Sequence, residues 1–125
     1  MGTKGFILVV DDEDSVRDVV TEALEDAGYI VDAASSGWEA LELLSGASFD
    51  LMFLDVKMPG MSGQQVLDRV KVERPELPVV MLTAVTGGGS EAEFRQRGAT
   101  DYLRKPCSME MVVATADRII QGLKR

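Results

Sequence analysis

The sequence contains no histidine, only one cysteine (Cys107) and no apolar run of the length that spans a membrane. The absence of histidine excludes a Ser-His-Asp triad, a Cys-His pair and a histidine-ligated zinc site. A single cysteine excludes an internal disulfide, which suits a reducing compartment. The amino-terminal stretch has too short an apolar core and too many acids for a signal peptide. We therefore expect a cytoplasmic protein with no membrane segment.

Basic residues are also in deficit. The 125 residues include 21 acidic and 13 basic side chains, which gives a net charge of −8. An acidic domain repels the phosphate backbone of nucleic acids, so we expect no direct nucleic acid binding by this chain. Apolar residues make up 46% of the chain, which is typical of a globular domain. The length fits one domain, placed at residues 1–125 with its core at about 5–123.

Five apolar runs alternate with amphipathic segments along the chain. The runs are continuous rather than alternating, a pattern typical of strands buried on both faces in a parallel sheet. They are FILVV (6–10), IVDAA (30–34), DLMFL (50–54), PVVML (78–82) and TDYL (100–103). Five such units joined by right-handed crossovers predict an α/β fold with a doubly wound, five-stranded parallel sheet.

Spacing and capping signals predict the helices. Residues 14–27 are amphipathic and are followed by Gly28 as a stop signal, and a last helix is predicted at about 108–123. Three serines fit the first position of a capping box: Ser36, Ser62 and Ser90. The fourth helix is expected to be short, after a mobile Gly87–Gly89 loop, because three glycines have large conformational freedom.

Chemically distinctive side chains follow four of the five predicted strands. In an open parallel α/β sheet, ligands bind outside the carboxyl ends of the strands, so these side chains should meet at one edge. They are Asp11 and Asp12 after the first strand, Asp55 after the third, Thr83 after the fourth and Lys105 after the fifth. We therefore predict one site with three carboxylates, a hydroxyl and an amine.

Three converging carboxylates need a positive charge. Two carboxylates about 5 Å apart repel each other by roughly 3 kcal/mol at an effective dielectric constant near 20. Hard oxygen ligands of this number and charge suit Mg²⁺, which shares its coordination with phosphate oxygens. Lys105 would supply a compact positive charge for a phosphate oxygen, and Thr83 a hydrogen bond. The site is therefore predicted to transfer a phosphoryl group to a carboxylate, with Asp55 as the nucleophile.

These residues resemble the conserved positions of response-regulator receiver domains. The matching features are the acidic pair in VVDDED, Asp55 in FLDVKMPGMSG, Thr83 in MLTA and Lys105 in YLRKP, over about residues 5–123. The resemblance implies a flavodoxin-like (βα)5 fold with strand order 2-1-3-4-5. It also implies that Asp55 accepts a phosphoryl group from a histidine kinase or phosphotransfer protein and signals to an output domain or partner protein.

The resemblance further implies a ligand set for Mg²⁺. Asp11, Asp12 and Asp55 would hold the ion directly or through water, with the backbone carbonyl of Lys57 as a further ligand. Lys105 would pair with the phosphoryl group, and the Lys105–Pro106 peptide bond would be cis.

A switch is implied as well. Thr83 would move toward the phosphoryl group, and Tyr102 would turn inward, changing the face made by the fourth helix, fifth strand and last helix. The chain would then be a signalling switch that catalyses only its own phosphorylation and dephosphorylation, and a phosphorylation-dependent homodimer is compatible with it. Positions 57 and 85 vary in the family with the lifetime of the phosphorylated state. Val85 offers no polar group to position water, so we expect slow autodephosphorylation, although Lys57 could interfere by reaching the phosphate.

Two alternatives stay open. Residues 12–16, DEDSV, fit the DxDxT or DxDxV motif of haloacid dehalogenase-type phosphatases, with Asp12 as the nucleophile. Those enzymes need a further acidic pair after the lysine, and only Glu110 and Asp117 follow Lys105, both within the predicted last helix. The other alternative is a pseudo-receiver that binds a partner without phosphorylation, although every chemical position is present. A flavodoxin-type carrier is excluded, because DDED would repel the flavin phosphate.

Overall fold

The computed structural model describes residues 3–83 and 90–123. Strands and helices alternate along the chain: β1 (Phe6–Val10), α1 (Asp14–Asp26), β2 (Ile30–Ala34), α2 (Gly37–Gly46), β3 (Leu51–Asp55), α3 (Gly63–Glu73), β4 (Val79–Thr83), α4 (Glu91–Gln96), β5 (Asp101–Arg104) and α5 (Met109–Leu123). The predicted Gly87–Gly89 loop and Val85 lie outside the described residues. No helix in the described ranges is both long and apolar enough to cross a membrane.

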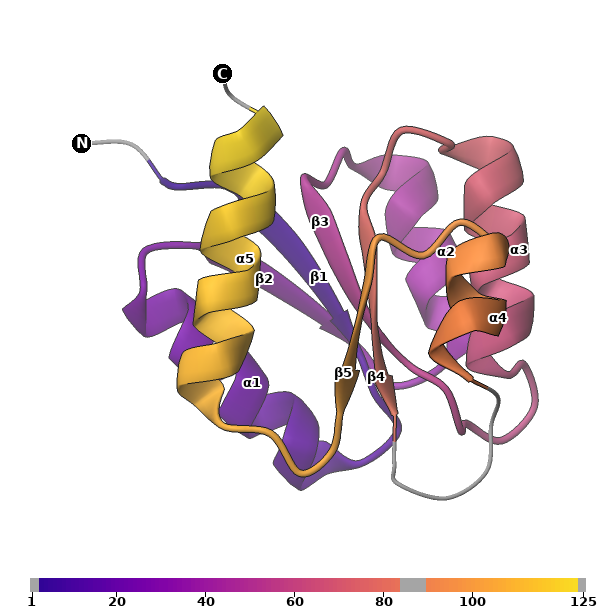
Figure 1. The fold of residues 1–125 in the computed structure, drawn as a ribbon, viewed down its shortest axis with the longest axis horizontal. Coiled ribbons are helices and arrows are strands. Elements are labelled where there is room, and N and C mark those ends of the chain that lie inside the picture. Colours follow the sequence, from indigo (N-terminus) through magenta and orange to yellow (C-terminus); the bar gives the residue numbers. More distant parts are fainter. Residues whose placement is uncertain (1–2, 84–89, 124–125) are drawn as a thin grey trace.

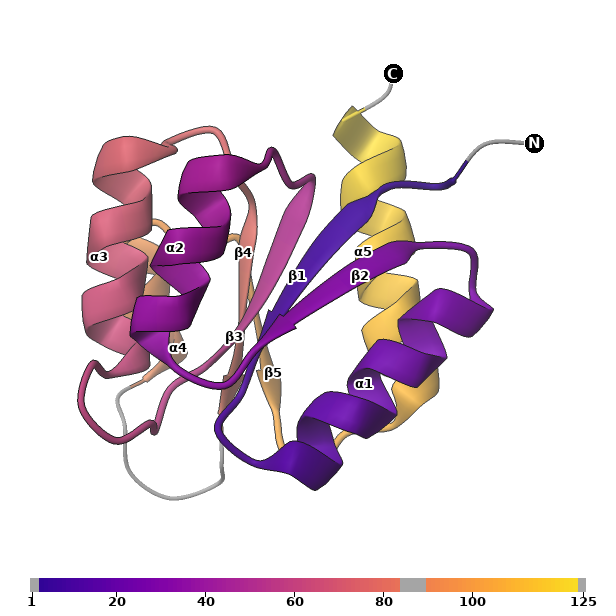
Figure 2. The same ribbon diagram turned by 180° about the vertical axis from the view of Figure 1, so that it is seen from behind.

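The five strands form one parallel sheet in the order β2-β1-β3-β4-β5, so the predicted fold class and strand order are confirmed. Helices α1 and α5 cover one face of the sheet, and α2, α3 and α4 cover the other (Figures 1 and 2). The order reverses between β1 and β3, whose carboxyl ends lie side by side. This is the switch point at which open α/β sheets bind their ligands.

Burial on both faces is confirmed for most of β1, β3 and β4 but is wrong for the edge strands. Every residue of β3 and β4 is buried, whereas β2 and β5 are mostly half-buried or exposed, and Ile30 is 53% exposed. An edge strand has a neighbour on one side only, so its side chains are covered less completely. The apolar core therefore lies in two layers on either side of the three central strands.

The last three strands begin and end one residue later than the sequence predicted. Asp55 and Thr83 both belong to strands, because Asp55 is in register with Leu82 and Thr83 with Arg104. Pairing continues just beyond the strand, where the Val56 amide donates to the Leu82 carbonyl at 3.2 Å. The charged residue therefore ends the apolar run without ending the strand, and the sheet itself fixes the backbone of Asp55.

The serine caps of α2, α3 and α4 are confirmed, but the complete capping box is confirmed only at Ser62. All three serines accept a hydrogen bond from the backbone amide three residues later, and α4 is short, with six residues. The reciprocal bond of a capping box is present at Ser62, whose amide donates to the Gln65 side chain at 2.9 Å. In α2 the Glu39 carboxylate instead accepts from the Ser35 amide, at 2.6 Å. Gly28 ends the α1 turn with a φ of 106°, the left-handed conformation that favours glycine.

Candidate functional site

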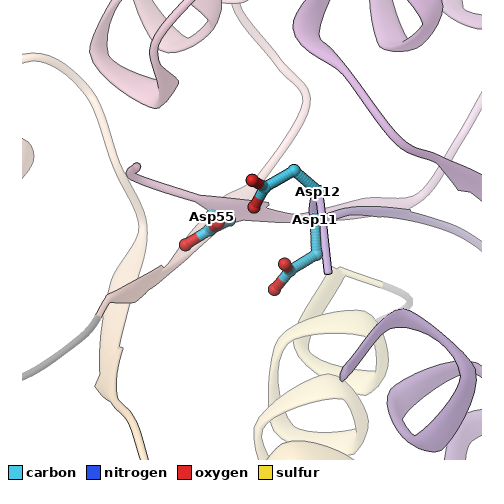
Figure 3. A group of neighbouring side chains, drawn as sticks. All are labelled: Asp11, Asp12 and Asp55. Carbon is cyan, nitrogen blue, oxygen red and sulfur yellow. The ribbon is translucent and has the colours of Figure 1, made fainter. Parts of the chain in front are cut away.

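The three predicted acids meet at the carboxyl ends of the neighbouring strands β1 and β3. One carboxylate oxygen from each of Asp11, Asp12 and Asp55 lies within 4.8 Å of the others, and Figure 3 shows the three side chains together. Asp11 is fully buried and Asp55 is 4% exposed, whereas Asp12 is exposed. The cluster thus has two fixed carboxylates in the wall and one that faces solvent.

Lys105 comes from the loop after β5 and bridges the two buried acids. Its Nζ donates to Asp11 Oδ2 at 2.7 Å and to Asp55 Oδ1 at 3.4 Å. The other Asp11 oxygen, Oδ1, accepts from the Glu13 amide at 3.0 Å. Both oxygens of Asp11 therefore have hydrogen bonds within the protein, and one ammonium serves two carboxylates.

Charge within the cluster is unbalanced, and the pKa values reflect this. Burial, and then the negative charge of Asp11, raise the pKa of Asp55 to about 6, against an opposing effect of Lys105. Burial alone would lower the pKa of Lys105, but its hydrogen bond to Asp11 and the charge of Asp55 leave that pKa above its ordinary value. Lys105 stays protonated, so one positive charge faces three carboxylates near neutral pH.

This excess of negative charge suits a divalent cation. Carboxylate oxygens are the ligands that Mg²⁺ prefers, and one or two protein carboxylates plus water and phosphate oxygens usually complete its shell. Asp12 is exposed and Asp55 is shared only loosely with Lys105. The donor set therefore fits Mg²⁺, with Asp12 and Asp55 as the oxygens least engaged by the protein. The side chain of Lys57 is exposed, and its carbonyl as a further ligand stays a prediction.

The predicted switch residues lie on the adjoining strands β4 and β5. Thr83 is 1% exposed at the carboxyl end of β4, and its carbonyl accepts from the Lys105 amide at 2.6 Å. Tyr102 is half-buried and in register with Met81, two residues before Thr83. Its ring lies 5.8 Å, centroid to centroid, from the ring of Phe94 in α4. Since residues i and i+2 of a strand share a face, Thr83 and Tyr102 belong to the face covered by α4.

The Lys105–Pro106 peptide bond is cis, as predicted. Beside it lies a groove between α1 and the β5–α5 loop that the sequence does not predict. This α1 groove has a volume of about 580 Å³ and is mostly apolar; it is lined by residues that include Val16, Val19, Val20, Lys105, Cys107 and Met109. Val19 is one of the apolar residues of the amphipathic segment 14–27, but its side chain is 52% exposed at the groove. A helical pattern does not reveal the groove, because residues of the β5–α5 loop form its other wall.

Comparisons with known proteins agree with this geometry. A family model described as the response regulator receiver domain matches residues 7–117. The chain is 38% identical over 117 residues to the DNA-binding transcriptional regulator NtrC of Escherichia coli, covering 94% of this chain and 25% of that protein. It is 39% identical over 108 residues to protein-glutamate methylesterase/protein-glutamine glutaminase 2 of Caulobacter vibrioides, covering 84% of this chain and 31% of that protein. The chain thus spans a quarter to a third of the length of these relatives.

Solved structures give the same result for the whole fold. The receiver domain of NtrX from Brucella abortus has a TM-score of 0.87 and 34% identity, covering 92% of this chain and 98% of that one. The chemotaxis protein CheY4 of Vibrio cholerae has a TM-score of 0.84 and 33% identity, covering 95% and 99%. With the acidic cluster, Lys105 and the strand order, these matches show that the chain belongs to the family of response regulator receiver domains.

Proposed function

We propose that Asp55 accepts a phosphoryl group in a Mg²⁺-dependent reaction and that the aspartyl phosphate switches the face formed by α4, β5 and α5. The observation that carries this proposal is the position of the Asp55 carboxylate. It is buried at the carboxyl end of a central strand, beside two further carboxylates and within reach of the Lys105 ammonium. The receiver family to which the chain belongs supports a phospho-accepting role.

In the proposed reaction a carboxylate oxygen of Asp55 attacks the phosphorus of a phosphohistidine. The new O–P bond forms as the N–P bond breaks, and the imidazole leaves and takes up a proton. Because the pKa of Asp55 is about 6, most of this carboxyl is ionised and able to attack at pH 7. Mg²⁺, held by Asp11, Asp12, Asp55 and the Lys57 carbonyl, would neutralise charge on the transferred group. Lys105 would leave Asp11 or Asp55 to pair with a phosphoryl oxygen.

Signalling would then run from Thr83 to α4. A hydrogen bond from the Thr83 hydroxyl to the phosphoryl group would draw that side chain toward the acids, and Tyr102 would fill the space it leaves. Tyr102 packs against Phe94, the buried residue of α4, so its movement would reach that helix directly. To move the two-state equilibrium from 1:99 to 99:1 takes about 5.5 kcal/mol, which a charge-assisted phosphoryl network can supply.

The phosphodonor is proposed to be a histidine kinase or a phosphotransfer protein that docks at the α1 groove. Lys105 lines both this groove and the acidic site, so a partner seated there would bring its phosphohistidine to Asp55. The half-exposed Val19 offers that partner an apolar anchor. This arrangement favours a donor with an apolar contact surface around its histidine.

Output is proposed to pass to a domain or protein beyond this chain. The relatives include NtrC and AlgB, both named as transcriptional regulators, and the chain matches about a quarter of each. The acidic receiver itself would not contact nucleic acid. We propose that it works in the cytoplasm as a switch, with no turnover beyond its own phosphorylation and dephosphorylation. A homodimer formed on phosphorylation would use the α4–β5–α5 face.

Intact mass spectrometry after incubation with acetyl phosphate and Mg²⁺ tests the proposal. The native chain and Asp12→Asn should gain one phosphoryl group, Asp12→Asn more slowly, whereas Asp55→Asn should gain none. Labelling that survives Asp55→Asn but not Asp12→Asn would favour the phosphatase alternative. If neither acetyl phosphate nor a histidine kinase labels the native chain, the result would favour the alternative of a pseudo-receiver that works without phosphorylation.

A second experiment tests the docking groove, using a kinase that phosphorylates the native chain. Val19→Glu should slow transfer from that kinase far more than transfer from acetyl phosphate, because only the protein donor needs the groove. Val72→Glu is the matched control, since Val72 is 82% exposed on α3, across the sheet. Equal slowing by both variants would contradict docking at α1.

A further inference from the structure

Arg17 is an unusual residue in its surroundings. It is the only basic residue between positions 11 and 32, a segment that contains nine acidic ones. Its side chain is only 16% exposed, although it lies in the first turns of a surface helix. An arginine held this close to the protein has specific partners rather than a general solubilising role.

The guanidinium of Arg17 connects the strand end to the helix start. Nη1 donates to the backbone carbonyl of Asp11 at 2.8 Å, and Nη2 pairs with the Asp14 carboxylate. Asp14 is 85% exposed, so its ion pair contributes little. The hydrogen bond to the Asp11 carbonyl contributes more, because a partly buried carbonyl without a donor destabilises the folded protein.

Every polar group of Asp11 is thereby held by a neighbour. The amide donates to the Ala34 carbonyl at 3.1 Å, the carbonyl accepts from Arg17, Oδ1 accepts from the Glu13 amide and Oδ2 accepts from Lys105. Of these contacts, the one from Arg17 alone holds the peptide that joins Asp11 to Asp12. The Asp12 side chain is attached at the other end of that peptide, so this contact bears on the position of its carboxylate.

We propose that Arg17 is a positioning residue that orients Asp11 and Asp12 for a divalent cation shared with Asp55. This rests on the Mg²⁺ site of the proposed function. Two possible roles for Arg17 predict opposite changes in Mg²⁺ affinity when the residue is replaced. A mere positive charge beside the site would repel the cation, so its loss would tighten Mg²⁺ binding. A positioning group holds the ligands in place, so its loss weakens Mg²⁺ binding.

Mg²⁺ titration of the unphosphorylated protein, followed by the NMR signals of the Asp12 and Asp55 amides, separates the two roles. Arg17→Met keeps the apolar stem of the side chain and removes both donors and the charge. We expect it to weaken Mg²⁺ binding about tenfold, as loss of a supporting partner of metal ligands commonly does. Arg17→Lys keeps the charge and one donor but not the planar fork, so its affinity should lie between those of Arg17→Met and the native chain.

Asp14→Asn is the matched control, because it breaks the ion pair and leaves the bond from Arg17 to the Asp11 carbonyl. Its Mg²⁺ affinity should stay within about fivefold of the native value, as for an exposed pair. Unchanged or tighter binding by Arg17→Met overturns the proposal. If Arg17→Met fails to fold, native affinity in Arg17→Lys overturns it instead. Absence of Mg²⁺ binding by the native chain would contradict both the proposed function and this role of Arg17, whereas unchanged binding by Arg17→Met contradicts the role of Arg17 alone.

Discussion

Replacing Asp55 with asparagine should make the metal-free protein more stable. The site places an ionised carboxylate where burial and the charge of Asp11 oppose it, so the pKa of Asp55 is about 6 rather than its ordinary 3.8. Each pH unit between the folded and unfolded pKa corresponds to about 1.4 kcal/mol. Ionised Asp55 therefore destabilises the fold by up to about 3 kcal/mol above pH 6, and asparagine removes the charge while keeping the shape.

The stabilisation by Asp55→Asn should depend on pH. A carboxyl whose folded pKa lies above the unfolded value favours folding when protonated, and this contribution is lost as pH rises through about 6. The gain from Asp55→Asn should thus be near zero below pH 3.8, grow between pH 3.8 and 6, and then stay constant. Urea denaturation with a chelator present, at pH 4.5 and at pH 7.5, measures the free energy of unfolding in both regimes.

Two controls sharpen the measurement. Asp12→Asn removes an exposed carboxylate from the same cluster, so it should stabilise the protein less than Asp55→Asn does. Added Mg²⁺ should stabilise the native chain more than it stabilises the Asp55→Asn variant, because the ion binds the folded native chain more tightly. The difference between their free energies of unfolding should therefore become smaller. The reasoning would be refuted if Asp55→Asn did not increase the free energy of unfolding at pH 7.5, or increased it equally at both pH values.

Three other substitutions test the surrounding structure. Lys105→Met should raise the pKa of Asp55 above 6, because it removes the charge that opposes protonation; carboxyl ¹³C NMR measures this, and a fall would contradict it. Gly63→Ala would place a Cβ 2.3 Å from the carbonyl oxygen of Asp55 and should reduce the free energy of unfolding by about 1–3 kcal/mol. Gly46→Ala is the control and should not destabilise the protein, because a Cβ there meets no atom within 4 Å. Phe94→Ala should cost about 3–5 kcal/mol, since the ring is 1% exposed, and a loss below 1 kcal/mol would mean that α4 does not depend on this anchor.

The order of elements and the acidic site were predictable because both follow from local patterns. Continuous apolar runs indicated a parallel sheet, and parallel strands bring their carboxyl ends to one edge. The carboxylates of Asp11, Asp12 and Asp55 therefore lie together at that edge. The predicted strand ends are less accurate, because a charge that ends an apolar run does not end the strand: the hydrogen bonds of the sheet continue through Asp55.

Features that depend on distant segments were not predictable. The role of Val19 in a groove requires the path of the β5–α5 loop, and the contact between Tyr102 and Phe94 requires the packing of α4 on β5. Arg17 had a weak signal, as the one base in an acidic segment, but a sequence does not tell which carbonyl an arginine reaches. The pairing of Lys105 with Asp11 as well as Asp55 likewise depends on the loop after β5.

The most direct test of the central claim is to locate the phosphoryl group on the chain. After treatment with acetyl phosphate and Mg²⁺, borohydride reduces an aspartyl phosphate to homoserine, and tandem mass spectrometry of peptides identifies the converted residue. The account predicts homoserine at position 55, in the peptide that contains FLDVKMPG, and none at positions 11 or 12. Homoserine at Asp12, or no converted aspartate in a chain that gains the phosphoryl mass, would contradict it.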